Sequence, residues 1–175
     1  MICGPPGSGK TSLAVRLGER IPAPTLFKDT IKEGISLTEG ATGTYGGSIA
    51  ERTFASLYAC VEVLVSNGCT TIVEAAFHRD FFEHEIGRFL KMADLRIVRC
   101  RVPDALAGER YRERAASGDP RRAAHPDARF IAQIEAGTLP WEQYEVELTD
   151  VPTIDVDTAA EYEPSLDTIV RFVLS

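Results

Sequence analysis

The sequence predicts an α/β fold in which a five-stranded parallel sheet lies between two layers of helices, a three-layer α/β/α sandwich. Segments with strand and helix character alternate along the 175 residues, which favours right-handed crossovers and a sheet covered on both faces. The glycine-rich segment GPPGSGKT joins the first strand to the first helix. With 44% hydrophobic and 26% charged residues, a chain of this length is expected to form one domain, residues 1–175.

The amino-terminal half contains apolar segments of two kinds. Short β-branched or apolar runs predict strands, and apolar residues at spacings of three and four predict helices. Prolines 22 and 24 end the first helix, and Asn67-Gly68 ends the long one. The expected elements are a strand at residues 1–3, a helix at 9–20, a strand at 25–27, a polar glycine-rich stretch at 39–47, a long helix from about 50 to 64, a strand at 70–73 and a helix at 79–92.

The carboxyl-terminal half continues the alternation, interrupted by the breaker-rich segment SGDPRRAAHPD at residues 117–127. The expected elements are a strand at 95–102, a helix at 103–116, a short helix ending near 136, a strand at 151–156 and an amphipathic helix at 165–174. Sheets of this kind bind ligands at the carboxyl ends of their strands. Polar residues directly after each strand are therefore the candidates for a functional site.

Residues 4–11 form a complete phosphate-binding loop, because Gly4, Gly9, Lys10 and Thr11 have the required spacing. Glycines let backbone N–H groups turn toward phosphate oxygens, and the next helix points its amino terminus at the anion. Lys10 is expected to reach the β- and γ-phosphates and Thr11 to offer its hydroxyl to Mg²⁺. The motif predicts a P-loop NTPase rather than an ordinary glycine-rich turn. The expected nucleotide-binding residues of this loop are Gly4, Pro5, Pro6, Gly7, Ser8, Gly9, Lys10, Thr11 and Ser12.

Asp29 directly follows the second predicted strand, in the segment KDTIKE. Its carboxylate is expected on the edge of the sheet that holds the phosphates, where it could orient and deprotonate a hydroxyl acceptor. The alternative is that Asp29 caps a helical turn beginning at Thr30. Lys28 and Lys32 are expected to be solvated lysines, with contact to phosphate or substrate as the alternative.

Glu74 ends the third predicted strand, in the segment TIVEAAF. A carboxylate at this place could bind Mg²⁺ or position the attacking group. Thr11 and Glu74 are therefore the predicted metal ligands. Phe77 and Arg79 follow on the same edge of the sheet and, with Asp29 and Glu74, are the predicted substrate-binding residues.

Arg110 and Arg114 are four residues apart and so share one face of a predicted helix. With the segment that follows, they predict a helical lid over residues 108–127. Guanidinium groups stabilise a transferring phosphoryl group, because they supply fixed positive charge. Either Arg121 or Arg122 could also face the site. The alternative is that the helix arginines pair with neighbouring glutamates on the surface.

The net charge of −7 argues against a broad nucleic-acid-binding surface. The segment from Arg96 to Arg122 nevertheless holds eight arginines against four acidic residues, which favours a localised phosphate site. No apolar run approaches membrane-spanning length and no signal peptide is visible, so the expected location is the cytoplasm. The four cysteines lack the spacing of a metal site.

The segments GPPGSGKT, KDTIKE, IVEAAF, IVRCRVP and ERYRERA occur in the order found in small P-loop kinases. The chain resembles the predicted ATP-dependent kinases of the zeta-toxin, chloramphenicol phosphotransferase and polynucleotide 5′-kinase type, which have an AAA-type P-loop domain. The resemblance implies ATP with Mg²⁺, a base at Asp29 and lid arginines at Arg110 and Arg114. One departure is Glu74, where such kinases usually have aspartate. The segment TIDVDT implies that the loop at Asp157 and Thr158 approaches the adenine.

These observations favour a kinase that moves the γ-phosphate of ATP to a hydroxyl of a small molecule. Its expected catalytic residues are Lys10, Asp29, Arg110 and Arg114, and Arg110 is also expected to contact the nucleotide. The alternatives are a nucleotide-dependent switch or regulatory ATPase, a non-catalytic nucleotide-binding module, and a nucleic-acid 5′-hydroxyl kinase, which the charge disfavours. The acceptor pocket is expected to be walled by Tyr45, Phe77 to Phe82, Trp141 and Tyr144.

Overall fold

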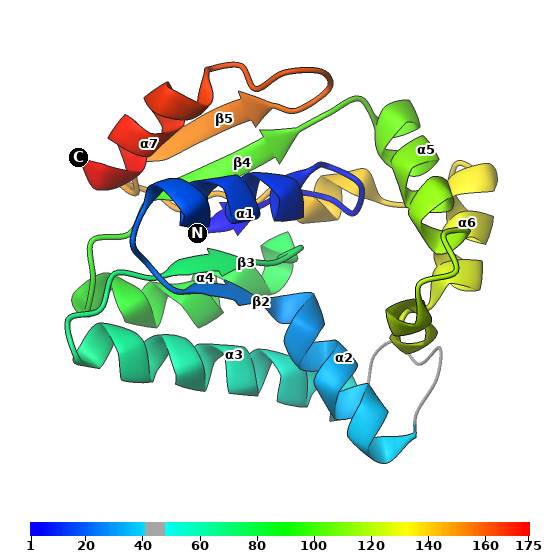
Figure 1. Cartoon of the computed structure of the whole chain (residues 1–175), viewed down its shortest axis with the longest axis horizontal. Helices are drawn as coiled ribbons and strands as arrows, with labels where there is room; N and C mark the ends of the chain where they lie inside the picture. The colour runs from blue at the N-terminus through cyan, green and yellow to red at the C-terminus, as the bar shows by residue number, and fades with distance from the viewer. Residues whose placement is uncertain (41–47) are drawn as a thin grey trace.

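A computed structural model describes residues 1–40 and 48–175 of the chain (Figure 1). Its centre is a five-stranded sheet in the order β2-β3-β1-β4-β5, and every neighbouring pair of strands is parallel. The parallel five-stranded sheet predicted from the sequence is thereby confirmed. The strands are β1 (Ile2–Cys3), β2 (Thr25–Phe27), β3 (Ile72–Glu74), β4 (Ile97–Arg101) and β5 (Thr153–Asp157).

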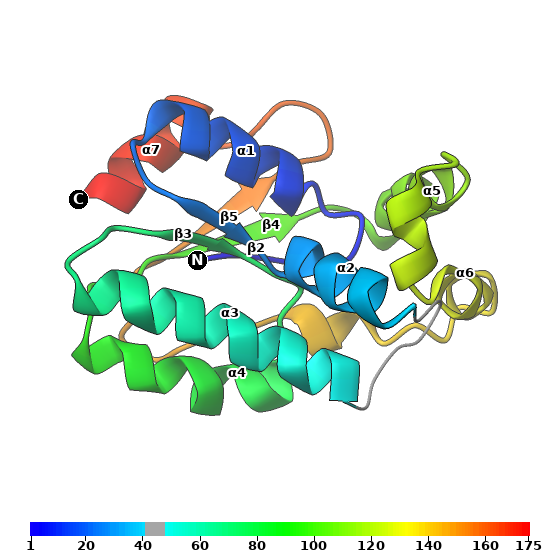
Figure 2. The same cartoon turned by 60° about the horizontal axis from the view of Figure 1, so that its bottom comes forward.

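Helices cover both faces of the sheet (Figure 2). On one face lie α1 (Lys10–Arg20) and α7 (Leu166–Leu174), and on the other lie α3 (Ser48–Ser66) and α4 (Arg79–Gly87), which continues into the 3₁₀ turn η1 (Arg88–Lys91). Each layer buries its own apolar cluster against the strands. The three-layer sandwich is therefore the fold of this chain.

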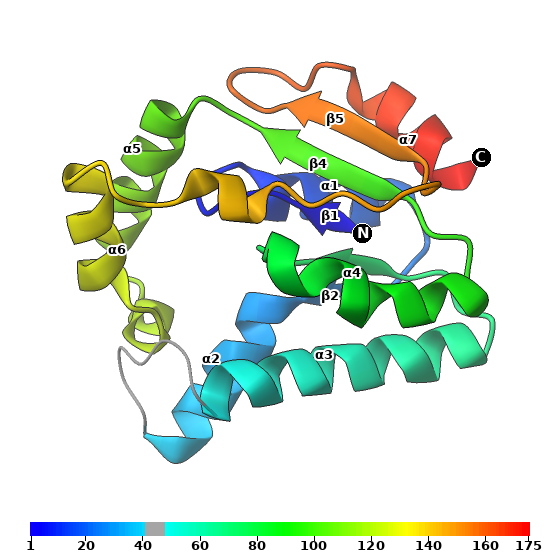
Figure 3. The same cartoon turned by 180° about the vertical axis from the view of Figure 1, so that it is seen from behind.

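A group of shorter helices lies beyond the carboxyl ends of the strands, at the right of Figure 1. It consists of α2 (Lys28–Glu39), α5 (Asp104–Ala115), the 3₁₀ turn η2 (Pro120–Ala124) and α6 (Asp127–Glu135). Seen from behind, the chain then returns along the sheet through the 3₁₀ turn η3 (Trp141–Tyr144) to β5 (Figure 3). This arrangement places α5, η2 and α6 over the end of the sheet where ligands of such folds bind.

Helix α2 is the one long element that the sequence pattern did not predict. Its fully buried residues are Lys32 and Ser36, and the partly buried Ile31 packs against the core, so its inner face mixes polar and apolar residues and lacks the continuous apolar stripe that signals a helix. Phe27 is its N-cap residue and Asp29 lies in its first turn, so the alternative in which Asp29 caps a turn at Thr30 is wrong. The expectation that Lys32 is solvated is also wrong, because only 6% of the residue is exposed.

Among the described residues, 1–40 and 48–175, no helix is long and apolar enough to cross a membrane.

Candidate active site

The loop between β1 and α1 has the backbone of a phosphate-binding loop. Gly4, Gly7 and Gly9 have φ angles of 143°, 83° and 77°, a region that side chains disfavour. A Cβ atom on Gly7 would lie 2.1 Å from the carbonyl oxygen of Ala107. The first turn of α1 closes when Leu13 N–H donates to Gly9 O at 3.0 Å. The amides of residues 10–12 precede that bond and face the end of the helix where anions bind.

Thr158, just after β5, fixes the phosphate loop from the other side. Its hydroxyl donates to Ser8 O at 2.6 Å, and its backbone N–H donates to Arg101 O at 3.0 Å. Thr158 is buried, and a Cβ atom on Gly9 would lie 3.3 Å from its side chain. The buried Ser8 hydroxyl has no hydrogen-bond partner within the described part of the chain. A polar atom of this kind fits a loop whose donors are meant for a bound phosphate.

Lys10 and Glu74 form a buried ion pair beneath the loop. Lys10 Nζ lies 3.8 Å from Glu74 Oε1 and donates to Pro5 O at 3.2 Å. Burial raises the pKa of Glu74 above its ordinary value, while the positive charge of Lys10 opposes that shift. Glu74 is the last residue of β3, as the sequence predicts. The pair brings the lysine that reaches phosphates together with the carboxylate predicted to bind a metal.

Asp29 lies at the carboxyl end of β2, whose Phe27 is in register with Glu74 of β3. Lys28 Nζ contacts Asp29 Oδ1 at 2.6 Å. Partial burial alone would raise the pKa of Asp29, but the charge and hydrogen bond of Lys28, with smaller contributions from His125 and Lys10, hold it well below its ordinary value. The carboxylate is therefore ionised at neutral pH and lies in the electrostatic field of Lys10.

The two predicted lid arginines lie on α5 but have different partners. The Arg110 guanidinium donates to Thr158 O at 2.9 Å and to Ala159 O at 2.8 Å, so it ties the lid helix to the loop after β5. The Arg114 guanidinium lies 5.4 Å from the centre of the Tyr111 ring. Burial raises the pKa of Glu74, and the positive charge of Arg114 is the smallest of the contributions that oppose this shift.

Arg122 is the inward-facing member of the pair Arg121 and Arg122. It forms an ion pair and hydrogen bonds with Asp127 and lies 5.4 Å from the centre of the Tyr111 ring. Arg121 is exposed and pairs with Asp119 at 2.5 Å. The Tyr111 hydroxyl donates to Asp127 at 2.8 Å. Asp127 therefore connects η2 with α5 and gives the lid a defined internal structure.

The lid also contacts α2 directly. His125 Nε2 lies 3.0 Å from Glu33 Oε1, and both side chains are largely buried. Burial lowers the pKa of His125, although Asp29 and Glu33 favour its protonated form. The contact joins the lid to the helix that begins at the predicted base.

Several residues predicted to bind the acceptor contact other parts of the protein. Phe77 is 2% exposed and packs in the core against the rings of Phe54 and Phe82, so its ring offers almost no surface to a substrate. Arg79 Nε donates to Glu145 O at 3.1 Å. Tyr144 and Trp141 join a small apolar cluster with the lid helices. Tyr45 lies outside the described residues.

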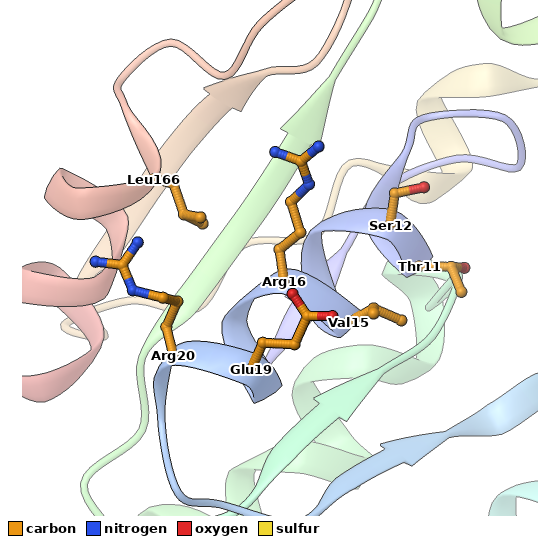
Figure 4. A pocket seen from close by; sticks show the side chains of 7 residues that line it. All are labelled: Thr11, Ser12, Val15, Arg16, Glu19, Arg20 and Leu166. Carbon is orange, nitrogen blue, oxygen red and sulfur yellow. The ribbon is translucent and has the colours of Figure 1, made fainter.

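Two large hollows in the described part of the chain adjoin the phosphate loop or the start of α1. One, of about 660 Å³, lies between Gly9, Arg110 and the loop after β5 and includes Arg16 and Tyr162. The other, of about 690 Å³, extends along the outer side of α1 and shares Arg16 with the first; Figure 4 shows its side chains, all from α1 except Leu166. The first, which we call the nucleoside hollow, lies beside the end of α1 that the motif predicts to bind phosphates.

The structure adds residues that sequence reasoning did not assign to the site. Arg16 and Tyr162, which are in cation–π contact at 5.6 Å, border the nucleoside hollow and belong to no motif. Thr158, which the resemblance implies lies near the adenine, lines the same hollow, and its hydroxyl also donates to Ser8 O of the phosphate loop. Lys32 follows Asp29 by one helical turn, a proximity that becomes meaningful only once α2 is known to be a helix.

Comparison with known proteins agrees with this geometry. The sequence profile of the family described as "AAA domain" matches residues 1–138. The fold is similar to a candidate kinase from Chloroflexus aurantiacus, with a TM-score of 0.77 and 22% identity over 99% of this chain and 94% of that one. It is also similar to a sugar kinase from Janibacter, with a TM-score of 0.63 and 15% identity over 99% and 90% of the two chains.

A third similar structure is a chain of the Pnkp1/Rnl/Hen1 RNA repair complex, with a TM-score of 0.56 and 18% identity over 90% of this chain and 51% of that one. No protein with a curated description matches the sequence. At these identities the structural matches establish the fold of a P-loop kinase.

Proposed function

The chain belongs to the AAA domain family, and from its P-loop kinase fold and its site we propose that it transfers the γ-phosphate of ATP to a hydroxyl group of a small molecule. One observation carries the proposal: Lys10, Glu74 and Asp29 follow or adjoin the carboxyl ends of three neighbouring strands. Lys10 lies 3.8 Å from Glu74, and its charge lowers the pKa of Asp29. A phosphate-binding lysine and an ionised base thus share one site.

The phosphate side of the reaction rests on the loop and on α1. Backbone amides of residues 7–12 and the amino terminus of α1 would bind the phosphate oxygens. Lys10 would neutralise charge between the β- and γ-phosphates. Arg110 borders the nucleoside hollow, and Arg114 would approach the transferring group from the lid. Each supplies fixed positive charge where negative charge is redistributed.

The proposed acceptor side depends on Asp29. The acceptor oxygen forms a bond to the γ-phosphorus, while the bond from that phosphorus to the bridging oxygen of ADP breaks. The proton of the hydroxyl passes to Asp29 and then to solvent. Because the pKa of Asp29 is depressed, the carboxylate orients the hydroxyl first. It accepts the proton late, when bonding to phosphorus has made that proton more acidic.

The residues at the end of β3 fit a magnesium ion. Mg²⁺ prefers oxygen ligands and is commonly held by one or two carboxylates together with substrate phosphates. Glu74 supplies a buried carboxylate and Thr11 a hydroxyl at the start of α1. We propose these two as the protein ligands. The ion would neutralise charge on the β- and γ-phosphates and so favour transfer.

Replacing Asp29 by Asn tests the assignment. We expect turnover to fall about 10²- to 10⁴-fold with nucleotide affinity nearly unchanged, measured as transfer from γ-labelled ATP and as binding of a non-hydrolysable ATP analogue. Asp80→Asn is the matched control, because Asp80 lies in the first turn of α4 as Asp29 does in that of α2, and Asp80 is exposed. Turnover at the wild-type rate in Asp29→Asn would remove the base assignment.

The choice of labelled acceptor decides between reaction classes. The panel contains sugars, sugar acids, sugar phosphates, nucleosides, aminoglycosides and 5′-hydroxyl oligonucleotides, each with and without EDTA. Labelling of a small molecule supports the proposal. Labelling of oligonucleotides alone would show a nucleic-acid end kinase, and ATP hydrolysis without any labelled acceptor would show a nucleotide-dependent switch or regulatory ATPase.

A further inference from the structure

The inner face of α2 is polar although it is buried. Lys28, Lys32 and Ser36 follow one another at intervals of four residues and therefore lie on one side of the helix. Lys32 is 6% exposed and Ser36 is 4% exposed. Burying a lysine and a hydroxyl costs free energy that hydrogen bonds and ionic contacts of these groups must offset. Positions of α2 that face solvent can hold polar side chains without this cost in free energy.

Ser36 shows directly that this face has an unused hydrogen-bonding group. Its hydroxyl is buried and has no hydrogen-bond partner within the described residues. An unsatisfied buried hydroxyl costs about 1–3 kcal/mol. Lysine can only donate hydrogen bonds, and serine can donate as well as accept. One group that contacts both side chains must therefore accept hydrogen bonds from them, and a negatively charged group does so best.

The electrostatic surroundings of Lys32 favour an anion. Burial, together with smaller contributions from the positive charges of Lys28 and Arg122, lowers the pKa of Lys32 to about 8. Asp29 and Asp127, which pair with Lys28 and Arg122, act in the opposite direction. Lys28 and Arg122 come from two elements, α2 and the lid. Three cationic side chains thus lie within electrostatic reach of one another beside the proposed base.

Packing around α2 encloses this region. The long helix α3 packs against one side of α2, and η2 of the lid packs against it as well. The contact between His125 and Glu33 joins the lid to α2 one residue beyond Lys32. Figure 1 shows α2 leading from the end of β2 toward the lid. Exclusion of water by these elements strengthens any ionic contact made there.

We propose that Lys32 and Ser36, beside the ion pairs of Lys28 with Asp29 and of Arg122 with Asp127, form a subsite for an anionic group of the acceptor. The inference rests on the proposed kinase function and specifies its substrate class: a polyhydroxylated small molecule that carries a carboxylate or a phosphate. The rise of an α-helix puts Lys32 about 4.5 Å and Ser36 about 10 Å along the axis from Asp29. These separations match a short chain with its reacting hydroxyl at Asp29 and its anionic group farther along α2.

Binding of defined probes tests the subsite independently of catalysis. The protein is first saturated with a non-hydrolysable ATP analogue and Mg²⁺, so that the phosphate loop cannot bind the probe. D-Gluconate and D-glucose 6-phosphate are then titrated by calorimetry against the uncharged D-glucose and D-sorbitol. We expect at least one anionic probe to bind more tightly than both uncharged probes. The preferred anion distinguishes a carboxylate acceptor from a phosphorylated one.

Two variants test whether the preference for anionic probes depends on α2. Lys32→Met keeps the length of the side chain and is expected to weaken anion binding roughly ten- to hundredfold, with little effect on the uncharged probes. Lys91→Met, at an exposed lysine of η1, is the control. Ser36→Ala is expected to weaken anion binding several-fold without lowering the melting temperature, because it removes an unsatisfied hydroxyl. This second variant remains informative even if Lys32→Met folds poorly.

The outcomes separate the subsite from the kinase. Equal binding of charged and uncharged probes, failure of both anions to bind, or a preference that survives both substitutions overturns the subsite. Label transfer to uncharged acceptors alone retains the kinase and removes the subsite. Anion binding that depends on Lys32, without transfer to any acceptor, retains the subsite and removes the kinase.

Discussion

Thr158→Val isolates the contact that holds the phosphate loop against the end of β5. Valine has nearly the same shape as threonine, so the substitution removes the hydroxyl and leaves the packing in place. The substitution removes the bond from the Thr158 hydroxyl to Ser8 O at 2.6 Å and the longer one from the same hydroxyl to Arg101 O at 3.2 Å. Arg101 O keeps a donor, because it also accepts from the backbone N–H of residue 158 at 3.0 Å. Only the phosphate loop therefore loses support.

The expected loss of stability in Thr158→Val follows from the burial of the hydrogen bond to Ser8 O. A buried neutral hydrogen bond contributes about 0.5–1.5 kcal/mol, and an acceptor left without its donor raises the cost to about 1–3 kcal/mol. For a chain of this size each kcal/mol lowers the melting temperature by about 2–4 °C. Thr158→Val should therefore melt roughly 2–12 °C below the wild type. We also expect weaker binding of the ATP analogue, because Ser8 belongs to the loop that binds the phosphates.

Thermal unfolding is followed with and without the ATP analogue. Thr158→Ser is the matched control, because it keeps the hydroxyl and loses only a methyl group. The serine variant should bind the analogue as the wild type does. If Thr158→Val unfolds at the wild-type temperature and binds the analogue with wild-type affinity, the contact does not hold the loop and the reasoning is refuted.

Two further predictions concern the base and the loop. Lys28→Met should raise the pKa of Asp29 and move the acidic limb of the kcat/KM profile to higher pH. In the wild type the depressed pKa of Asp29 stabilises the folded protein. This stabilisation is complete above the pKa of Asp29 in the unfolded chain, near 4, and is lost as the pH falls toward the pKa of Asp29 in the folded protein. An unchanged limb would contradict this role of Lys28. Gly7→Ala places a Cβ atom 2.1 Å from Ala107 O at a φ of 83°, so this variant should bind the ATP analogue about tenfold more weakly or worse. The control is Gly87→Ala, which has open space around the new Cβ atom and should bind the analogue normally. Equal affinities of the two variants would show that the loop adapts.

The predictable part of the fold depended on apolar periodicity. The five strands and the helices at both faces were predicted because each buries an apolar stripe or run against the sheet. Element ends differed by a few residues: the third strand was expected at residues 70–73 and is Ile72–Glu74. The helix predicted over residues 79–92 is an α-helix followed by a 3₁₀ turn. Such differences are ordinary where hydrogen bonding at element ends is irregular.

The predictable part of the site depended on motifs tied to strand ends. The phosphate-loop motif predicted the place of Lys10, and the end of β3 predicted the place of Glu74. Because β1 and β3 are neighbours in the sheet, the two side chains lie close together, 3.8 Å apart. Side-chain partners could not be predicted in this way. Sequence reasoning did not distinguish Arg121 from Arg122, and only the folded arrangement of η2 and α5 places Arg122 beside Tyr111. Phe77 shows the reverse case, because its place after β3 suggested the site while its burial puts it in the core.

Helix α2 was not predicted from the sequence pattern, and the reason for this is also the reason for its functional interest. A helix is recognised in a sequence by the apolar face that it buries, and α2 buries Lys32 and Ser36 instead. Because the Ser36 hydroxyl lacks a partner among the described residues, the packing of α3 and the lid against α2 offsets its cost. Proteins tolerate such conflicts between local pattern and structure mainly at functional sites. If Ser36→Ala raises the melting temperature and weakens binding of an anionic acceptor, the unsatisfied hydroxyl is retained for the ligand rather than for the fold.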